Sequence, residues 1–286
     1  MDDQGRDHAG DQPLTSASTF FLTDKQGMPV VGFGTYQLTD DEAEASTLAA
    51  LQAGYRHVDT AQGYHNEAGV GRGIKASGLA RGDVFVTTKL WPGNAAWGMP
   101  VMDFDQTIAC AEASVASLGL EYVDLYLIHA PFAFAGGVEA GLAQWKALLA
   151  LKARGLCRAV GVSNFGVAHL AHLEAAGLAL PDANQLELHP LHQQRGTLAW
   201  MAARGILPIA YSSLAPLGSW RVKDDGSKHG SGKDRAAEAG VAAAAAVAAV
   251  AASHSDMRGA PSSRTRESKP SSFSSNGLAP DAGGGV

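Results

Sequence analysis

Seven short apolar runs, separated by stretches with helical periodicity, limit this chain to very few folds. The runs are Val31–Gly34, Tyr55–Asp59, Val84–Lys89, Val123–His129, Arg158–Ser163, Ala183–Glu187 and Leu207–Tyr211. The helical stretches are Asp40–Ala53, Glu67–Ser77, Asp105–Leu118, Val138–Arg154, Val167–Ala176 and Gly196–Arg204. Strands that are apolar throughout, alternating with amphipathic helices, predict a parallel sheet whose faces are covered by helices.

The order of these elements favours an α/β fold of the (β/α)8 TIM-barrel type over a doubly wound sheet. Polar residues stand at the ends of successive strands, where such barrels place their chemistry, and 286 residues suit one domain of this size. A small hairpin is expected first, from Thr19–Leu22 and Met28–Pro29 around an Asp24–Gly27 turn. No eighth strand can be identified after Leu207–Tyr211, so the barrel is predicted to be incomplete.

The two ends of the sequence differ in composition from the part between them. Residues 1–18 are polar and acidic, and residues 255–286 are mainly Ser, Pro, Gly and charged residues. Such segments cannot bury enough apolar surface to offset the entropy lost on ordering. We therefore expect a barrel unit over 19–254, with an alanine-rich helix at 235–254, between a disordered N-terminal segment and a disordered tail.

Composition and charge exclude several classes of partner. The net charge is −6 and no basic stripe is present, so nucleic acid and anionic membranes are poor partners. Val241–Ala252, the longest apolar run, is too short to cross a bilayer, and the N-terminus lacks the apolar core of a signal peptide. Cys110 and Cys157 are expected to be reduced, buried thiols. These features predict a soluble, cytoplasmic protein. A monomer is expected, although the sequence has no feature that sets the oligomeric state.

Four residues with acid–base chemistry stand at or just after predicted strand ends. Asp59 ends one strand, Tyr64 lies in the following loop, and Lys89 and His129 end the next two strands. An ammonium beside a phenol lowers the pKa of the phenol, which is ordinarily about 10, and a carboxylate keeps the ammonium charged and oriented. An imidazole aimed at the same point can hydrogen-bond a carbonyl oxygen. Together these groups predict general acid catalysis at a carbonyl, although each alone is commonly an ordinary packing or surface residue.

Neutral amide and hydroxyl groups stand at the later strand ends. Ser163 and Asn164 follow from the run GVSNF, Gln185 from NQLELHP and Tyr211 from LPIAYSSL. The first three side chains could hold a carboxamide, and the tyrosine could stack on a flat ring such as nicotinamide. A second interpretation is that GVSNF is a tight turn in which Ser163 or Asn164 caps the next helix. Both interpretations can hold together.

The eighteen residues Gly54–Gly71, GYRHVDTAQGYHNEAGVG, resemble the signature of the aldo-keto reductases. The resemblance extends over about Phe20–Ser219 and includes GVSNF, NQLELHP and LPIAYSSL. It implies NADPH-dependent reduction of small aldehydes or ketones, with Tyr64 as proton donor, Lys89 tuning its pKa, Asp59 ordering the lysine and His129 positioning the carbonyl. No metal is implied.

The same resemblance implies further contacts with cofactor and substrate. Nicotinamide contacts fall at Ser163, Asn164, Gln185 and Tyr211, a further cofactor contact at Thr35, and the start of a pyrophosphate loop at Ser212 and Leu214. Substrate-facing aromatic residues fall at Tyr36 and Trp91, for which simple packing is an equally good interpretation.

The sequence departs from the family pattern after Ser255. A strand with a Lys-Ser motif and a following Arg, which in the family contact the adenosine end of NADPH, is not recognisable. Lys269, Arg264 and Arg266 have no strand context, so NADH stays open as the cofactor. Three alternatives to an active reductase also stay open: a catalytically weak or inactive nicotinamide-binding or regulatory protein, a channel-type subunit, and a truncated non-functional product.

Two other patterns do not predict sites. The run GVGRG at Gly69–Gly73 lacks the third glycine of a dinucleotide fingerprint and lies inside a helical stretch. The pairs His169/His172 and His189/His192 lack a third ligand at metal spacing, so no metal site is expected.

Overall fold

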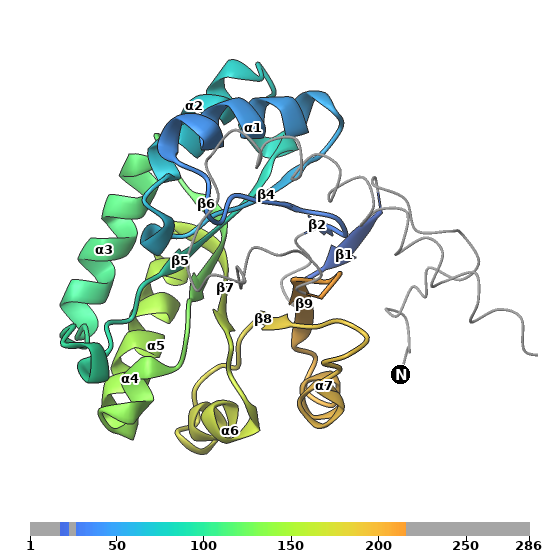
Figure 1. The fold of residues 1–286 in the computed structure, drawn as a ribbon. Helices are drawn as coiled ribbons and strands as arrows, with labels where there is room; N and C mark the ends of the chain where they lie inside the picture. Colours follow the sequence, from blue (N-terminus) through green and yellow to red (C-terminus); the bar gives the residue numbers. More distant parts are fainter. Residues whose placement is uncertain (1–17, 23–26, 216–286) are drawn as a thin grey trace, which may run out of the picture.

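The computed structural model describes residues 18–22 and 27–215, which form a curled parallel sheet with helices on its outer side (Figure 1). Its strands are β3 (Phe33–Gly34), β4 (His57–Asp59), β5 (Phe85–Leu90), β6 (Val123–Ile128), β7 (Cys157–Ser163), β8 (Ala183–Glu187) and β9 (Leu207–Tyr211). Each strand pairs with the next one along the chain, in the order β3-β4-β5-β6-β7-β8-β9. The predicted barrel-type α/β fold is confirmed, and within the described ranges no eighth strand joins the sheet.

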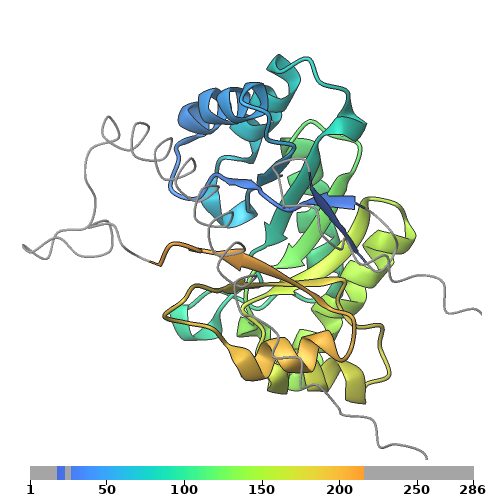
Figure 2. The ribbon, with the colours of Figure 1, turned by 90° about the vertical axis from the view of Figure 1, so that its right-hand side faces the viewer.

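The helices fall close to the predicted stretches. They are α1 (Asp40–Gln52), α2 (Glu67–Ala76), α3 (Phe104–Ser117), α4 (Phe132–Ala135), α5 (Val138–Ala153), α6 (Val167–Ala175) and α7 (Arg195–Ala202). Capping explains two of the starts: Thr39 and Asp103 each accept a hydrogen bond from the backbone N–H three residues later. Helix α4 is the exception, because the segment between Pro131 and Gly137 gave no helical pattern in the sequence. Figure 2 shows α1 and α7 far apart, near the first and last strands of the curled sheet.

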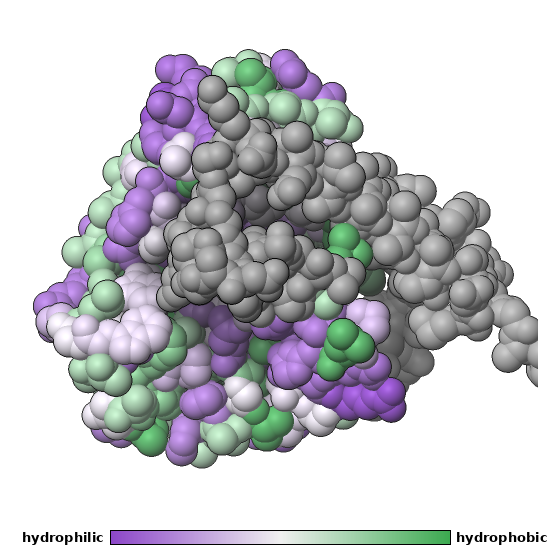
Figure 3. All heavy atoms as spheres, in the orientation of Figure 1, coloured by the Kyte–Doolittle hydropathy of each residue, from purple (hydrophilic) through white to green (hydrophobic). Residues whose placement is uncertain are grey.

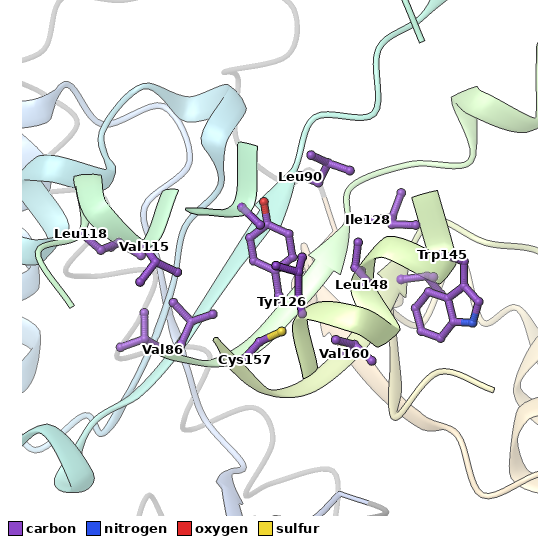
Figure 4. Close-up of a cluster of buried hydrophobic side chains, with 14 of the residues drawn as sticks. Val86, Leu90, Val115, Leu118, Tyr126, Ile128, Trp145, Leu148, Cys157 and Val160 are labelled. Atoms are coloured by element: carbon purple, nitrogen blue, oxygen red, sulfur yellow. The ribbon is translucent and has the colours of Figure 1, made fainter. Parts of the chain in front are cut away.

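The sheet separates two groups of buried apolar side chains because successive residues of a strand point to opposite faces. Val86, Leu90 and Tyr126 belong to the larger group, which packs against helix residues such as Trp145 and Leu148 (Figure 4). Trp145 and Leu148 are completely buried, so replacing the tryptophan by alanine is expected to cost about 3–5 kcal/mol. This outer core fixes the helices against the sheet.

The smaller group lies on the inner face, near the amino ends of the strands. Phe85, Leu125 and Ala183 come from three strands, and Met28 of the hairpin packs on them. The hairpin consists of β1 (Thr19–Phe21) and β2 (Gly27–Pro29), which pair antiparallel as predicted. It covers one end of the curled sheet and leaves the carboxyl ends of the strands for polar residues.

Three glycines of α2 belong to helix packing. A Cβ at Gly69 would lie 1.9 Å from the backbone oxygen of Asp40, and one at Gly71 would lie 2.0 Å from that of Leu118. At Gly73 the backbone oxygen of Glu44 would be 2.6 Å away. The run GVGRG therefore lets α2 approach α1 and the turn after α3 closely, which agrees with its position inside a helix.

Several sequence-based expectations concern other residues. The segments 1–17 and 216–286 lie outside the described residues, and so do most of the Asp24–Gly27 turn and the predicted helix at 235–254. Both cysteines are free, with Cys157 buried and Cys110 partly buried. In the described part of the chain, no helix is long and apolar enough to cross a membrane. Figure 3 shows hydrophilic and hydrophobic residues interspersed on the face of Figure 1.

Candidate active site

The four predicted acid–base residues lie at the carboxyl edge of the sheet. Asp59 ends β4, Lys89 is the fifth residue of β5, and His129 follows β6 directly. Tyr64 ends a short 3-10 helix, η1 (Gln62–Tyr64), in the loop after β4. Because β4, β5 and β6 are parallel neighbours, their carboxyl ends bring these side chains to one place.

A buried ion pair forms the centre of this arrangement. Lys89 Nζ donates to Asp59 Oδ1 at 2.5 Å, to the backbone oxygen of Thr60 at 2.9 Å and to Tyr64 Oη at 3.4 Å. The lysine side chain is 1% exposed. Gln185 Nε2 donates to the other oxygen of Asp59 at 2.7 Å, so both carboxylate oxygens are fixed. The ammonium is thus held by three oxygen atoms, one of which is the tyrosine hydroxyl.

The protonation states of Lys89 and Tyr64 follow from burial and from their mutual contact. Burial lowers the pKa of the Lys89 ammonium, but the Asp59 charge and the Tyr64 phenol outweigh it and raise the pKa overall. Burial raises the pKa of Tyr64, and the lowering effect of the Lys89 charge does not compensate. Lys89 lowers the phenol pKa as expected, but burial contributes more, so the net shift of the Tyr64 pKa is upward. At neutral pH the lysine is charged and the phenol keeps its proton.

The His129 imidazole faces the same tyrosine. Its ring centroid lies 5.5 Å from that of Tyr64 in an edge-on arrangement. Burial lowers the pKa of His129 to about 4, with a smaller contribution from the Lys89 charge and a small opposing one from Asp59. His129 Nδ1 is buried and finds no hydrogen-bond partner among the described residues. A neutral imidazole, able to donate or accept a hydrogen bond, therefore lies beside the phenol.

A chain of hydrogen bonds joins the predicted carboxamide-binding residues. Tyr211 Oη donates to Asn164 Oδ1 at 2.8 Å, and Asn164 Nδ2 donates to Ser163 Oγ at 3.1 Å and to the backbone oxygen of His129 at 3.0 Å. Ser163 Oγ donates in turn to the backbone oxygen of Gln185 at 2.9 Å. The set joins the acid–base residues directly through Gln185 and His129.

This donor set fits a nicotinamide carboxamide in its chemistry. Ser163, Asn164 and Gln185 offer neutral amide and hydroxyl groups, which match a neutral carboxamide in both donors and acceptors. Tyr211 is partly buried, with its hydroxyl already bound to Asn164, so its ring is held in a defined position. The alternative that Ser163 or Asn164 caps the next helix is wrong, because Gly166 occupies the N-cap of α6 and its N–H donates to His169 Nδ1.

Thr35 lies beneath the site, bonded to residues that the sequence did not connect with it. It is completely buried, and its hydroxyl donates to the backbone oxygen of Asp59 at 3.2 Å and to Asn66 Oδ1 at 3.5 Å. Asn66 also accepts from Thr60 Oγ1 at 2.8 Å and donates to the backbone oxygens of Thr35 and Leu38, both at 2.9 Å. One buried amide therefore joins the loops after β3 and β4.

Sequence reasoning missed Asn66 because the residue has the usual signature of a helix cap. It does occupy the N-cap position of α2, yet its side chain forms no capping hydrogen bond. Its partners lie up to 31 residues away in sequence, so no local pattern contained the signal.

The two predicted substrate-facing aromatics flank the central tyrosine and histidine. The Tyr36 ring lies 5.0 Å from Tyr64, and the Trp91 ring lies 5.7 Å from His129. Two further aromatic residues, Trp97 and Phe132, contact Trp91 at 6.1 and 5.8 Å between ring centroids. These two were not predicted, since neither belongs to a strand-end motif.

Ser212 and Leu214 lie just beyond β9, at the end of the described range, and both are partly buried. Ser212 has a left-handed backbone, with φ of 51°, and its carbonyl accepts a hydrogen bond from the Ala215 N–H at 2.9 Å. The sharp turn ends the strand at the carboxyl edge, on the same side of the sheet as the other predicted residues. Across the part of the chain that the structure describes, no group of three or more His, Cys, Asp or Glu residues could hold a metal ion.

Comparison with known proteins places these features in context. The aldo/keto reductase family model matches residues 30–259, which reaches further toward the C-terminus than the predicted resemblance over Phe20–Ser219. An aldo-keto reductase from Mycolicibacterium vanbaalenii is 46% identical over 204 residues, covering 70% of each chain. Methylglyoxal reductase DkgA from Yersinia pestis is 41% identical over 203 residues, covering 71% of this chain and 69% of the relative.

Solved structures agree with these relatives. An aldo/keto reductase from Brucella melitensis matches with a TM-score of 0.63 and 38% identity, over 70% of this chain and 74% of that one. A Bombyx mori aldo-keto reductase in complex with NADP matches with a TM-score of 0.61 and 32% identity, over 69% of this chain and 67% of that one.

Proposed function

The chain belongs to the aldo-keto reductase family, and from this premise we propose that it reduces an aldehyde or ketone to an alcohol with NADPH, using Tyr64 as the proton donor. When bound, a reduced nicotinamide would supply the hydride for the carbonyl carbon. The Tyr64 hydroxyl gives its proton to the carbonyl oxygen, so that a C–H and an O–H bond form as the C=O double bond becomes single.

The observation that carries this proposal is the contact of Lys89 Nζ with Tyr64 Oη at 3.4 Å, with Asp59 behind the lysine. The raised pKa of Tyr64 keeps the proton on the phenol until it is needed. As the proton leaves, the Lys89 charge stabilises the phenolate that forms. The phenolate then regains a proton from solvent, which completes the cycle.

His129 and the amide chain supply positioning in this proposal. Because the pKa of His129 is lowered to about 4, its imidazole is neutral and can donate one hydrogen bond to the carbonyl oxygen beside Tyr64. Ser163, Asn164 and Gln185 hold the carboxamide of the nicotinamide, and the ring of Tyr211 supports the ring of the cofactor.

The remaining roles in the proposal concern the outer parts of both ligands. Thr35, Ser212 and Leu214 contact the cofactor, and Tyr36 and Trp91 contact the substrate. NADPH is proposed over NADH because a similar solved reductase, that of Bombyx mori, is in complex with NADP. This preference is measured by dividing kcat/KM for NADPH by kcat/KM for NADH. A quotient below one would contradict the proposed preference.

The direct test follows the near-ultraviolet absorbance of NADPH while purified full-length protein acts on a panel of aldehydes. Tyr64→Phe is expected to lower turnover by roughly 100- to 10,000-fold while NADPH binding is retained. Tyr55→Phe is the matched control, since Tyr55 is partly buried and contacts Phe33 away from the ion pair. Turnover retained in Tyr64→Phe, or lost equally in both variants, would contradict the assignment. NADPH binding without turnover in the wild type would favour the non-catalytic alternative.

A further inference from the structure

Aromatic rings extend in unbroken contact from the proposed proton donor to the surface. The His129 ring contacts the rings of both Tyr64 and Trp91, at 5.5 and 5.7 Å between centroids. Beyond it, Trp91, Trp97 and Phe132 contact one another at 6.1, 5.8 and 5.3 Å. We call these three residues the aromatic wall. It begins beside the reacting groups and leads away from them.

The wall comes from two loops at the carboxyl edge. Trp91 follows β5 directly, and Trp97 ends the 3-10 helix η3 (Ala95–Trp97) in the same loop. Phe132 begins α4, the helical turn after β6. Since β5 and β6 are paired neighbours, the two loops leave the sheet side by side, where barrels of this type bind their substrates.

The turn that carries Trp97 is fixed by its own hydrogen bonds. Asn94 and Met99 exchange a pair of backbone hydrogen bonds, both at 3.0 Å, and the Trp97 N–H donates to the Asn94 oxygen at 3.0 Å. The Asn94 side chain accepts from the Ala96 N–H at 3.0 Å. At the base of the turn, Gly93 has φ of +77°, and a Cβ there would lie 2.0 Å from the backbone oxygen of Pro100.

A buried glutamine fastens the same turn to the body of the protein. Gln144 of α5 is completely buried, and its Nε2 donates to the backbone oxygens of Pro92 and Met102 at 2.8 and 3.1 Å. Trp91 Nε1 also contacts Met99 Sδ at 3.3 Å. The backbone on both sides of Trp97 is therefore held before any ligand arrives.

Trp97 is nevertheless 61% exposed. A large apolar ring kept exposed by a fixed turn loses little conformational entropy when a flat partner covers it. Aromatic pairs gain affinity beyond simple burial, which corresponds to roughly 3- to 10-fold for one ring contact. The exposed face thus has the properties of a preorganised site for a planar apolar group.

We infer that Trp97, backed by Phe132, is a specificity-determining residue that binds the distal ring of the substrate. The preferred substrates are aldehydes or ketones carrying an extended aromatic group, bicyclic rather than small and aliphatic. This inference rests on the proposed function, because the wall acts on a carbonyl placed between Tyr64 and His129. It predicts that this chain prefers such substrates over a small dicarbonyl such as methylglyoxal.

The experiment compares naphthaldehyde with methylglyoxal in wild type, Trp97→Ala and Trp97→Phe, with NADPH saturating. Trp97→Ala is expected to lower kcat/KM for naphthaldehyde by roughly 10-fold, mainly through KM, and to change that for methylglyoxal by less than about twofold. Trp97→Phe should restore most of the loss, because it keeps an aromatic face. Phe21→Ala removes an aromatic ring that is 69% exposed, from the hairpin at the other end of the sheet, and should leave both substrates unaffected.

An equal effect of Trp97→Ala on both aldehydes would overturn the inference, because a purely structural role lowers both. A drop in kcat alone would overturn it as well. Calorimetric binding of naphthamide, measured with the oxidised cofactor present, separates this inference from the proposed function. If the wild type reduces no carbonyl yet binds naphthamide more tightly than Trp97→Ala does, the proposed reduction is contradicted and the ring-binding role of Trp97 is supported. If naphthamide binds equally to wild type and Trp97→Ala, or to neither protein, the ring-binding role of Trp97 is contradicted, whether or not the protein reduces carbonyls.

Discussion

Each end of the sheet places a carboxylate beside a basic side chain, but the two pairs are built differently. Toward the amino ends of the strands, Asp124 accepts from the Arg81 guanidinium at 2.7 Å and from the Val86 backbone N–H at 2.9 Å. At the carboxyl edge, Asp59 receives its two bonds from the side chains of Lys89 and Gln185. The first carboxylate joins one strand to the next, whereas the second only positions other side chains.

A second pair repeats the amino-end design. Asp182, just before β8, accepts from Lys152 Nζ and from the Val160 N–H of β7, both at 2.8 Å. The difference between the amino and carboxyl ends of the strands indicates where a buried charge can take part in chemistry. A carboxylate bonded to backbone fixes the sheet, and one bonded to side chains leaves its cation directed at a hydroxyl that can exchange a proton.

Replacing one lysine at each end of the sheet by methionine tests this difference most directly. Lys89→Met removes the charge beside Tyr64 and is expected to lower turnover by roughly 100-fold or more, because the phenolate loses its stabilising partner. Lys152→Met is the matched control, and its turnover per folded molecule should equal that of wild type. Steady-state kinetics corrected for the folded fraction decide between them. Equal losses in the two variants would mean that the ends do not differ in the proposed way.

Replacing a carboxylate at the amino ends of the strands should lower stability and leave activity unchanged. Asp124→Asn keeps a side chain of the same shape but removes the charge facing Arg81, so unfolding should become easier by about 2 kcal/mol. Urea denaturation measures this change, and kcat/KM in the absence of urea should be unaltered. An unchanged denaturation midpoint, or a lost activity, would show that the amino-end pair does not serve stability alone.

Asn66 offers a further test, because its side chain supports the loops beneath the proposed active site. Asn66→Ala removes the side-chain amide that donates to the backbone oxygens of Thr35 and Leu38, of which Thr35 keeps only the bond from the Leu38 N–H at 3.2 Å. We expect this loss to loosen the loops that carry Tyr36 and Tyr64. We expect roughly a 10-fold drop in kcat in addition to a loss of stability. Asp124→Asn serves as the reference for stability loss alone. If the two variants lose stability to a similar extent and neither loses kcat, Asn66 has no positioning role.

The smallest expected effect concerns pH. Burial and the Lys89 charge lower the pKa of His129 to about 4, against the weaker raising effect of Asp59. The imidazole is therefore neutral above that pH and takes up a proton only as the pH falls through about 4. The pH profile of kcat/KM should show no inflection near 6.5, the ordinary value for histidine. An inflection at that pH that disappears in His129→Asn would contradict this assignment.

Much of the fold was predictable because most strands lie in short, largely apolar runs and the stretches between them have helical periodicity. The bounds of β8 and β9 agree with the prediction at both ends, and the others differ by a few residues. Helix α4 was missed because its four residues, FAFA, are too few to show a period.

The site was predictable from local sequence where a residue lies at or just after the end of a strand. Asp59, Lys89 and His129 were found in this way, and the structure brings them together as the parallel arrangement requires. The bond of Gln185 to Asp59 joins residues 126 positions apart, so no local pattern contains it. Trp97 lies in an irregular turn whose shape depends on Gln144, in a helix far along the chain. Contacts of this kind come from tertiary packing, which a local pattern does not encode.

The strictly sequential order of the strands also bears on how the chain assembles during synthesis. Each strand from β4 to β9 pairs with the one made just before it. A newly made strand therefore meets a finished partner as it leaves the ribosome, and only one or two α-helices separate paired strands along the chain. The order of synthesis is therefore the same as the order of strand pairing, so the growing chain can extend an existing template one βα segment at a time.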